Sequence, residues 1–218
     1  METSKINMSN LYKKRFKNRN KEGIWKILCK YFFQKFIKED SIIIDIAAGY
    51  CEFINNIHAK NKVAVDVNPD IRNYAGEDVT VINDSVFNIF NHFKSDCDII
   101  FASNFFEHLN SREDVISVME ICHKLLSVGG KLLILQPNIK YTKETYWDFI
   151  DHKIPITDKS LIEAGELCGF KTIKNIPRFL PYTTKSSVPQ NNIFVLLYLK
   201  FPPIWYFMGK QSFLVLEK

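Results

Sequence analysis

The sequence predicts an α/β fold, with a mostly parallel sheet that is covered by helices on both faces. The chain has 218 residues, of which 46% are hydrophobic and 24% charged, which suits a globular protein with a full core. From Ser41 onward, short apolar runs alternate with stretches of helical periodicity. Continuous apolar runs are typical of parallel strands buried on both faces. We therefore expect residues 1–218 to form one domain.

Residues 1–38 are expected to form a helical segment ahead of the sheet. Within it, residues 23–38 carry apolar side chains at helical spacing. The preceding stretch LYKKRFKNRNK, residues 11–21, is basic with interleaved aromatic residues. Its charge pattern favours a solvated arm, and contact with a phosphate-bearing substrate is the alternative.

The remaining elements follow in alternation along the chain. The expected strands are 42–46, 62–67, 79–82, 98–102, 131–136, 170–176 and 212–217. The expected helices are 51–57, 112–126 and 158–168. Gly129 and Gly130 are expected to stop the helix 112–126. Thr157 or Asp158 is expected to cap the start of the helix 158–168, and Gly169 is expected to cap its end.

Two connections, 137–156 and 177–211, are too long to be turns. Both follow strands, so we expect them to emerge as insertions at the sheet edge where α/β proteins bind ligands. The apolar run 193–208 is too short for a membrane span and is broken by Lys200, Pro202 and Pro203. Contact with a membrane surface stays open, because apolar residues and lysines lie close together there.

Charge and cysteine usage narrow the function classes. The net charge of +5 suits an anionic small molecule but is too small to argue for nucleic acid. Five scattered cysteines without a CxxC pair indicate reduced thiols in a cytoplasmic protein, and they predict neither a metal site nor a disulfide framework. The polar start METSKINMSN does not have the pattern of a signal peptide.

Polar side chains stand at the ends of four successive predicted strands. They are Asp45, Asp66, the pair Asn83–Asp84, and Asn104. Asp66 follows Asp45 by about 20 residues, the spacing at which an acidic residue accepts hydrogen bonds from ribose hydroxyls. Each residue alone is explained by a cap or a solvated turn. Together, and in this order, they predict a ligand-binding edge.

The stretches that carry these residues resemble the motifs of class I S-adenosylmethionine-dependent methyltransferases. They are IIIDIAAGYCEF, VAVDVNPD, INDS, CDIIFASNFFEHL and LLSVGGKLLILQPN. The resemblance covers about residues 40–176. It implies S-adenosyl-L-methionine as cofactor and a Rossmann-like seven-stranded sheet. In that fold the last strand runs antiparallel between the fifth and the sixth.

The resemblance also implies roles for the residues at the strand ends. Asp45 would orient the first loop and meet the methionine amino group, Asp66 would hold the ribose, and Asp84 would bind the adenine amino group. The other implied cofactor-binding residues are Ala47, Gly49, Val67, Ser85, Asn104 and Phe105.

Only Gly49 remains of the three glycines expected in the first motif, because Ala47 and Cys51 stand at the other two positions. Alanine is tolerable at position 47 if φ is negative there. A dehydrogenase is the alternative for such a loop, but its turn holds a pyrophosphate against a helix N-terminus and needs small residues. The stretch AAGYC leaves less room for that group. It therefore favours a cofactor without phosphate.

Candidate bases lie in two segments. His108 follows the fourth predicted strand, and a structural histidine is the alternative there. His152 would share a face with Asp148 if that segment is helical, so we expect His108, His152 and Asp148 as catalytic candidates. The expected acceptor-binding residues are Tyr146, Trp147, Arg178, Tyr182 and Lys185. For the two cations, solvated surface charge is the alternative.

The segments YWDFIDH and IPRFLPYTTKS are similar to those of small bacterial methyltransferases that accompany surface-polysaccharide genes. This similarity implies O-methylation of a small anionic acceptor, such as a nucleotide-linked sugar or a phosphate or phosphoramidate precursor of capsular polysaccharide. Two other classes stay open. The basic arm favours an RNA methyltransferase, and the altered first motif favours a non-catalytic adenosyl-binding protein.

Overall fold

The computed structural model describes residues 22–182 and 192–218, so the basic arm 11–21 lies outside the described residues. The strands are β1 (Ile42–Ile46), β2 (Asn61–Val65), β3 (Val79–Ile82), β4 (Cys97–Ser103), β5 (Leu126–Pro137), β6 (Lys171–Ile176) and β7 (Gln211–Glu217). The α-helices are α2 (Glu22–Tyr31), α3 (Arg112–Leu125), α4 (Ile139–Thr142), α5 (Asp158–Leu167), α6 (Asn192–Lys200) and α7 (Pro203–Met208). Six 3₁₀ turns join them: η1 (Phe33–Phe36), η2 (Ile54–Asn56), η3 (Pro69–Asn73), η4 (Val86–Asn91), η5 (Phe106–His108) and η6 (Lys143–Asp148).

The strands form one seven-stranded sheet in the order β3-β2-β1-β4-β5-β7-β6. The pairs from β3 to β5 are parallel, whereas β7 runs antiparallel to both β5 and β6. This arrangement confirms the predicted Rossmann-like sheet and the place of its antiparallel last strand. Because β1 to β5 run in the same direction, their carboxyl ends meet at one edge of the sheet.

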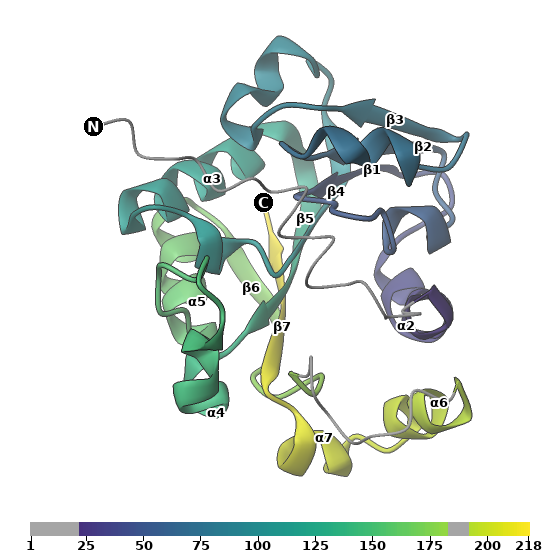
Figure 1. The fold of residues 1–218 in the computed structure, drawn as a ribbon. Helices are drawn as coiled ribbons and strands as arrows, with labels where there is room; N and C mark the ends of the chain where they lie inside the picture. The colour runs from purple at the N-terminus through teal and green to yellow at the C-terminus, as the bar shows by residue number, and fades with distance from the viewer. Residues whose placement is uncertain (1–21, 183–191) are drawn as a thin grey trace.

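Helices cover both faces of the sheet (Figure 1). On one face α3 and α5 pack against β5, β6 and β7, and on the other α2 lies with η1, η2 and α6. Within β1, Ile44 and Ile46 join the first core cluster and Ile43 joins the second. A strand buried on both faces carries apolar residues at every position, which explains the continuous apolar runs of the sequence.

An aromatic cluster fills the second face. Phe33 is completely buried, and its ring lies within ring-contact distance of Trp25, Phe32, Phe53, Phe101, Phe179 and Phe213. These rings come from α2, the junction between α2 and η1, the loop after β1, β4, the segment after β6, and β7. The high phenylalanine content of the chain therefore serves packing in large part.

Three expected elements differ from the structure. The helix expected over 51–57 is reduced to η2, because Cys51 takes a left-handed conformation that interrupts it. The helix expected to reach residue 126 ends at Leu125, and β5 starts at Leu126, five residues before the expected strand. Hydrogen bonds between this segment and Lys218 draw it into the sheet. The helix expected over 23–38 ends at Tyr31.

The two long connections contain short helices, as their length suggests. The first holds α4 and η6, and the described part of the second holds α6 and α7. In the described part of the chain, none of the helices has the length and apolar character needed to cross a membrane.

Replacement of Phe33 by alanine should lower the free energy of unfolding by about 3–5 kcal/mol, because it leaves a cavity among six rings. Val128 is 93% exposed, so Val128→Ala is the control and should change it by less than about 0.5 kcal/mol. Urea denaturation of the three proteins measures both effects. Similar values for the two variants would contradict the packing described.

Candidate functional site

The loop after β1 makes a sharp turn in a left-handed conformation. The φ angles are +56° at Ala47, +55° at Gly49 and +58° at Cys51. The condition under which alanine is tolerable at position 47, a negative φ, is therefore not met. A non-glycine residue in this region costs about 1–2 kcal/mol, so the loop holds strain at two positions. The chain adopts the geometry of a three-glycine turn although two of the glycines are replaced.

The Asp66 carboxylate holds this loop against the next one. Its Oδ2 accepts a hydrogen bond from the Gly49 N–H at 2.8 Å, and its Oδ1 accepts one from the Asn68 N–H at 2.8 Å. Burial raises the pKa of the Asp66 carboxyl, and the two N–H donors partly offset this effect. Each carboxylate oxygen can accept a second hydrogen bond, so the group retains the capacity to bind hydroxyls.

Asp45 is buried at the end of β1 and belongs to a set of neighbouring acids. Burial raises the pKa of its carboxyl well above the ordinary value, and the charges of Asp66 and Glu52 raise it further. A hydrogen bond from the Ile54 backbone acts in the opposite direction. Such a set of acids favours a cationic ligand group, because a positive charge relieves the repulsion.

Asp84 lies beyond β3 in a polar network of its own. It accepts hydrogen bonds from the Ser85 N–H, the Asn88 side chain and the His92 Nε2–H at 2.7–2.8 Å. The Asn88 and His92 hydrogen bonds lower the pKa of Asp84 to about 2. Ser85 caps η4 by accepting from the Phe87 N–H. Asp84 is therefore ionised at neutral pH, and both of its oxygens have partners.

The remaining implied cofactor residues also lie at this edge. Asn104 follows β4 with a φ of +49° and donates to the Ser103 hydroxyl at 2.9 Å. Phe105 packs against the core beside it. Val67, after β2, is 55% exposed although it is apolar. The fold thus places the nine residues expected to contact the cofactor at the carboxyl ends of β1 to β4 or in the loops that follow them.

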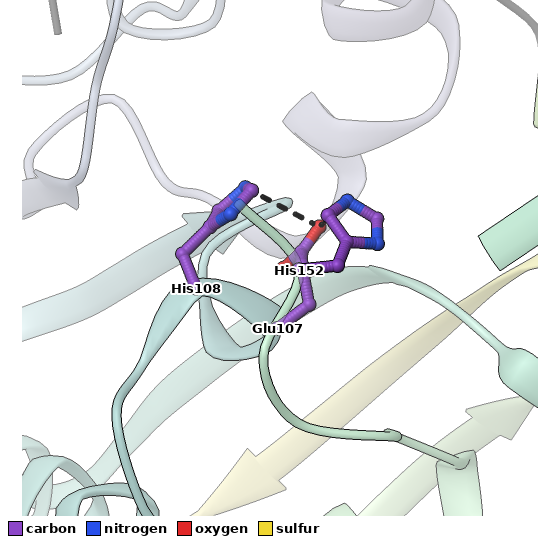
Figure 2. A group of neighbouring side chains, drawn as sticks. All are labelled: Glu107, His108 and His152. Atoms are coloured by element: carbon purple, nitrogen blue, oxygen red, sulfur yellow. Dashed lines mark ion pairs between the residues drawn. The ribbon is translucent and has the colours of Figure 1, made fainter. Parts of the chain in front are cut away.

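The two candidate histidines come together from different segments. The ring centroids of His108 and His152 are 5.1 Å apart, and Glu107 Oε1 lies 3.7 Å from His108 Nε2 and 3.9 Å from His152 Nε2. Figure 2 shows the Glu107 carboxylate between the two imidazoles. Sequence reasoning missed Glu107, although it stands beside His108 in FFEHL. Its burial, which the sequence did not reveal, sets it apart from an ordinary surface glutamate.

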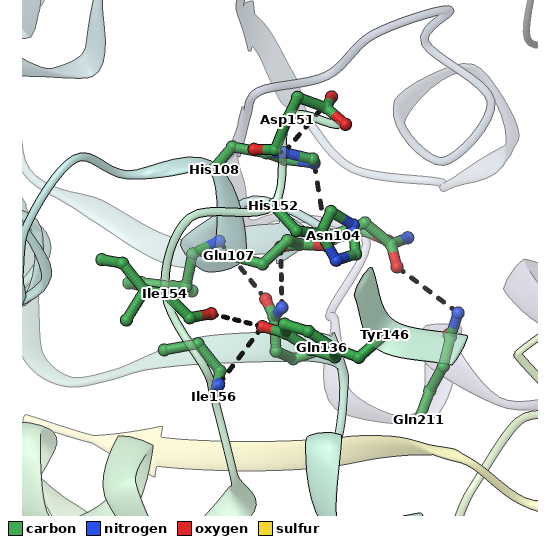
Figure 3. A network of polar contacts seen from close by, with 12 residues as sticks. Asn104, Glu107, His108, Gln136, Tyr146, Asp151, His152, Ile154, Ile156 and Gln211 are labelled. Carbon is green, nitrogen blue, oxygen red and sulfur yellow. Dashed lines mark hydrogen bonds and ion pairs between the residues drawn. The ribbon is translucent and has the colours of Figure 1, made fainter. Parts of the chain in front are cut away.

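Neighbouring groups orient these three side chains (Figure 3). Gln136, near the end of β5, donates its amide N–H to Glu107 Oε2 at 2.7 Å. The His108 Nδ1–H donates to the Asp151 carbonyl at 3.0 Å. The Lys153 N–H donates to the Glu107 carbonyl at 2.8 Å. These bonds join η5, β5 and the insertion after β5 into one network.

The connection after β5 also carries the candidates Asp148, Tyr146 and Trp147, and the first two lie in surroundings that were not expected. Asp148 is exposed, and η6 ends there, so no helix aligns it with His152. Tyr146 is completely buried, and its hydroxyl donates to the Ile154 carbonyl at 2.6 Å and accepts from the Ile156 N–H. Tyr146 therefore has a structural role, and the expectation that it contacts the acceptor directly is corrected. Trp147 beside it is half-exposed and is available for contact with a ligand.

Arg178 has structural partners near the end of α7. Its guanidinium donates to the carbonyls of Gly209 and Phe207 at 2.9 and 2.8 Å and lies over the rings of Tyr141 and Tyr206. It anchors the end of α7, and its role in binding an anionic acceptor stays a prediction. The Tyr182 hydroxyl lies 3.4 Å from His152 Nε2. Lys185 lies outside the described residues.

Comparison with known proteins relates the chain to solved structures only, since no protein-family model and no curated protein matches it. An S-adenosylmethionine-dependent methyltransferase from Archaeoglobus fulgidus superposes with a TM-score of 0.69 at 18% identity, over 96% of this chain and 99% of that one. One from Clostridium acetobutylicum gives 0.63 at 10% identity, over 96% and 97%. The plantazolicin methyltransferase BamL, solved with S-adenosylhomocysteine, gives 0.62 at 15% identity, over 100% and 91%. At these identities the likeness establishes the Rossmann-like methyltransferase fold.

Ala47→Gly should raise the free energy of unfolding by up to about 1 kcal/mol, because relief of the left-handed strain exceeds the added flexibility of the unfolded chain. The adjacent Ala48 is not left-handed. Ala48→Gly is therefore the matched control and should lower the free energy of unfolding by about 0.4–1 kcal/mol. Equal losses in the two variants under urea denaturation would show that residue 47 carries no strain.

Asp45→Asn should stabilise the protein at pH 7 more than at pH 4. The folded state holds the Asp45 proton more tightly than the unfolded state, whose carboxyl titrates near the ordinary pKa of 3.8. The free energy of unfolding therefore falls as the pH rises from that value through the folded-state pKa, and asparagine removes this loss. Denaturation at both pH values tests the difference, with the exposed Asp148→Asn as control. A gain independent of pH would rule out a perturbed Asp45.

Proposed function

We propose that this chain is an S-adenosyl-L-methionine-dependent methyltransferase that acts as one domain over its 218 residues. The observation that carries the proposal is the ordered set of polar residues at the carboxyl ends of β1 to β4, on a fold that solved S-adenosylmethionine-dependent methyltransferases share. Enzymes with open α/β sheets bind their ligands at this edge. The S-adenosylhomocysteine in the plantazolicin methyltransferase complex supports the choice of cofactor.

The residues at this edge fit the chemical groups of the cofactor. The acids around Asp45 match the cationic amino group of the methionine portion, since a positive charge relieves the repulsion that raises the pKa of Asp45. The free lone pairs of Asp66 match the ribose hydroxyls. The exposed Val67 offers an apolar contact for the adenine, and Asp84 and Ser85 lie at the next strand end.

When bound, the cofactor supplies a methyl group on a sulfonium that is already activated for transfer. The acceptor oxygen would take this methyl group, and the electron pair of the broken carbon–sulfur bond would stay on the sulfur as a neutral thioether. The chain's task is to hold the acceptor in line and to remove its hydroxyl proton. We assign the second task to His108 and His152, and the support is that their rings lie 5.1 Å apart close to the end of β4.

For the acceptor we propose a small anionic molecule bearing a hydroxyl, such as a nucleotide-linked sugar or a phosphate or phosphoramidate precursor of capsular polysaccharide. The support is the similarity of residues 146–152 and 176–186 to methyltransferases of surface-polysaccharide genes, together with the positive net charge. Trp147, Arg178 and Tyr182 are the described acceptor-side candidates with exposed surface. Five unpaired cysteines fit a cytoplasmic enzyme.

The experiment that tests this function is a methyl-transfer screen. The protein is incubated with S-adenosylmethionine and panels of nucleotide-linked sugars and phosphorylated precursors, and products are read by the mass shift of one methyl group. Methylation of one chemical class is the expected result. Cofactor binding without transfer to any class, although panels of RNA and of uncharged small molecules are included, would favour a non-catalytic adenosyl-binding protein.

Asp66→Ala should abolish measurable binding of S-adenosylmethionine in calorimetry, because the variant loses both the ribose contact and the bond to Gly49. Asp98 is the matched control, since it accepts a hydrogen bond from the Ile42 N–H at 2.8 Å at the opposite edge of the sheet. Asp98→Ala should destabilise the fold without changing the affinity. Near-normal affinity in Asp66→Ala would refute the assignment.

A further inference from the structure

We propose that Glu107, His108 and His152 form a binding site for one divalent transition-metal ion. One potential ligand atom of each residue lies within 4.8 Å of the other two. The Glu107 Oε1 is 3.7 Å from one imidazole Nε2 and 3.9 Å from the other. Donor atoms that share an ion at about 2.1 Å are about 3–4 Å apart, so small rotations of these side chains close the site.

The buried carboxylate is the first physical argument for an ion. Glu107 is only 1% exposed. Gln136 donates to its Oε2, whereas its Oε1 has no hydrogen-bond partner in the structure. The two imidazoles are too far from Oε1 for hydrogen bonds. A buried carboxylate oxygen without a donor is costly, and a cation between it and the imidazoles would remove that cost.

The orientation of the imidazoles is the second argument. His108 uses its Nδ1–H to donate to the Asp151 carbonyl at 3.0 Å. This bond selects the tautomer that leaves the Nε2 lone pair directed away from that carbonyl, and metal-binding histidines are held by their other nitrogen in this way. The Tyr182 hydroxyl is 3.4 Å from His152 Nε2, near the limit of a hydrogen bond.

The ligand set indicates which ion. Two imidazole nitrogens and one carboxylate suit Zn²⁺, Co²⁺, Mn²⁺ or Fe²⁺, whereas Ca²⁺ and Mg²⁺ prefer oxygen ligands. His152 and Glu107 are buried, but the His108 side chain is 28% exposed. Solvent therefore reaches the site from that side. The arrangement of three protein ligands with an open position is typical of catalytic sites rather than structural ones.

If the chain transfers methyl groups as proposed, the ion would also take part in that reaction, and the two histidines would serve it as metal ligands. An acceptor hydroxyl bound to the ion at the open position would have a lowered pKa, as metal-bound water does. Its proton would pass to solvent, and the oxygen would then attack the methyl carbon. His108 and His152 would act as ligands in place of bases. The sequence predicted no metal site, because the ligands are divided between two distant segments.

The test uses the full chain after removal of metal by chelation. Co²⁺ is added without cofactor, and binding is followed by calorimetry and by the visible absorption of the ion. We expect one Co²⁺ per chain and an absorption spectrum typical of mixed nitrogen and oxygen ligands. Glu107→Gln, which keeps the shape of the side chain, and His152→Ala should each weaken binding at least about 10-fold.

His123→Ala is the matched control, because His123 lies against Phe170 in another part of the fold. It should bind Co²⁺ as the unaltered chain does. Burial raises the pKa of all five cysteine thiols, which disfavours competing thiolate sites. The proposal is overturned if the unaltered chain binds no Co²⁺, or if folded Glu107→Gln and His152→Ala proteins bind as tightly as the control.

Calorimetry with S-adenosylmethionine on the same samples separates this site from the proposed function. Cofactor binding without Co²⁺ binding would reject the metal site and leave the methyltransferase proposal intact. Co²⁺ binding that depends on Glu107 and His152, without cofactor binding, would support the metal site and reject the proposed function.

Discussion

The carboxylate of Asp66 is the interaction on which the carboxyl edge of the sheet depends. It accepts one backbone N–H from the loop after β1 and another from the loop after β2. Hydrogen bonds to a charged group contribute about 1.5–3 kcal/mol each. This is comparable to the cost of the left-handed residues Ala47 and Cys51, about 1–2 kcal/mol each. The carboxylate can therefore hold the loop in a strained form that the replaced glycines would have adopted freely.

Two groups of side chains with buried carboxyl groups lie along the same edge of the sheet. Near the end of β1, burial raises the pKa of the Asp45 carboxyl, and the charges of Asp66 and Glu52 raise it further. Near the end of β4, one Glu107 oxygen faces two imidazoles beyond hydrogen-bond distance. Strain and uncompensated charge persist in proteins where function requires them. On the proposed function, the first set faces a cationic cofactor group, and the second is the proposed metal site.

The succession of strands along the chain and the polar residues at their ends could be predicted from the sequence, because burial on both faces and strand alternation leave a strong periodic pattern. The place of the antiparallel last strand followed from the resemblance to a known family. The helix cap at Thr157 was predictable because threonine is a preferred N-cap residue. The structure adds a capping box with Ser160. The φ angles of Ala47 and Cys51 were not predictable, since tertiary hydrogen bonds override local preference there. Nor was Glu107, whose burial depends on contacts with β5 and the insertion after it. The structural role of Arg178 arises in the same way from α7.

On the proposed function, the loops after β1 to β4 together bind S-adenosylmethionine. The most direct measurement is amide hydrogen exchange, followed by mass spectrometry, with and without S-adenosylhomocysteine. We expect bound S-adenosylhomocysteine to slow exchange in residues 45–51, 66–74, 83–92 and 103–108. Exchange at the opposite edge of the sheet, around Asp98 and Lys131, should be unchanged. Unchanged exchange in all four loops at saturating ligand, or protection confined to another part of the fold, would contradict it.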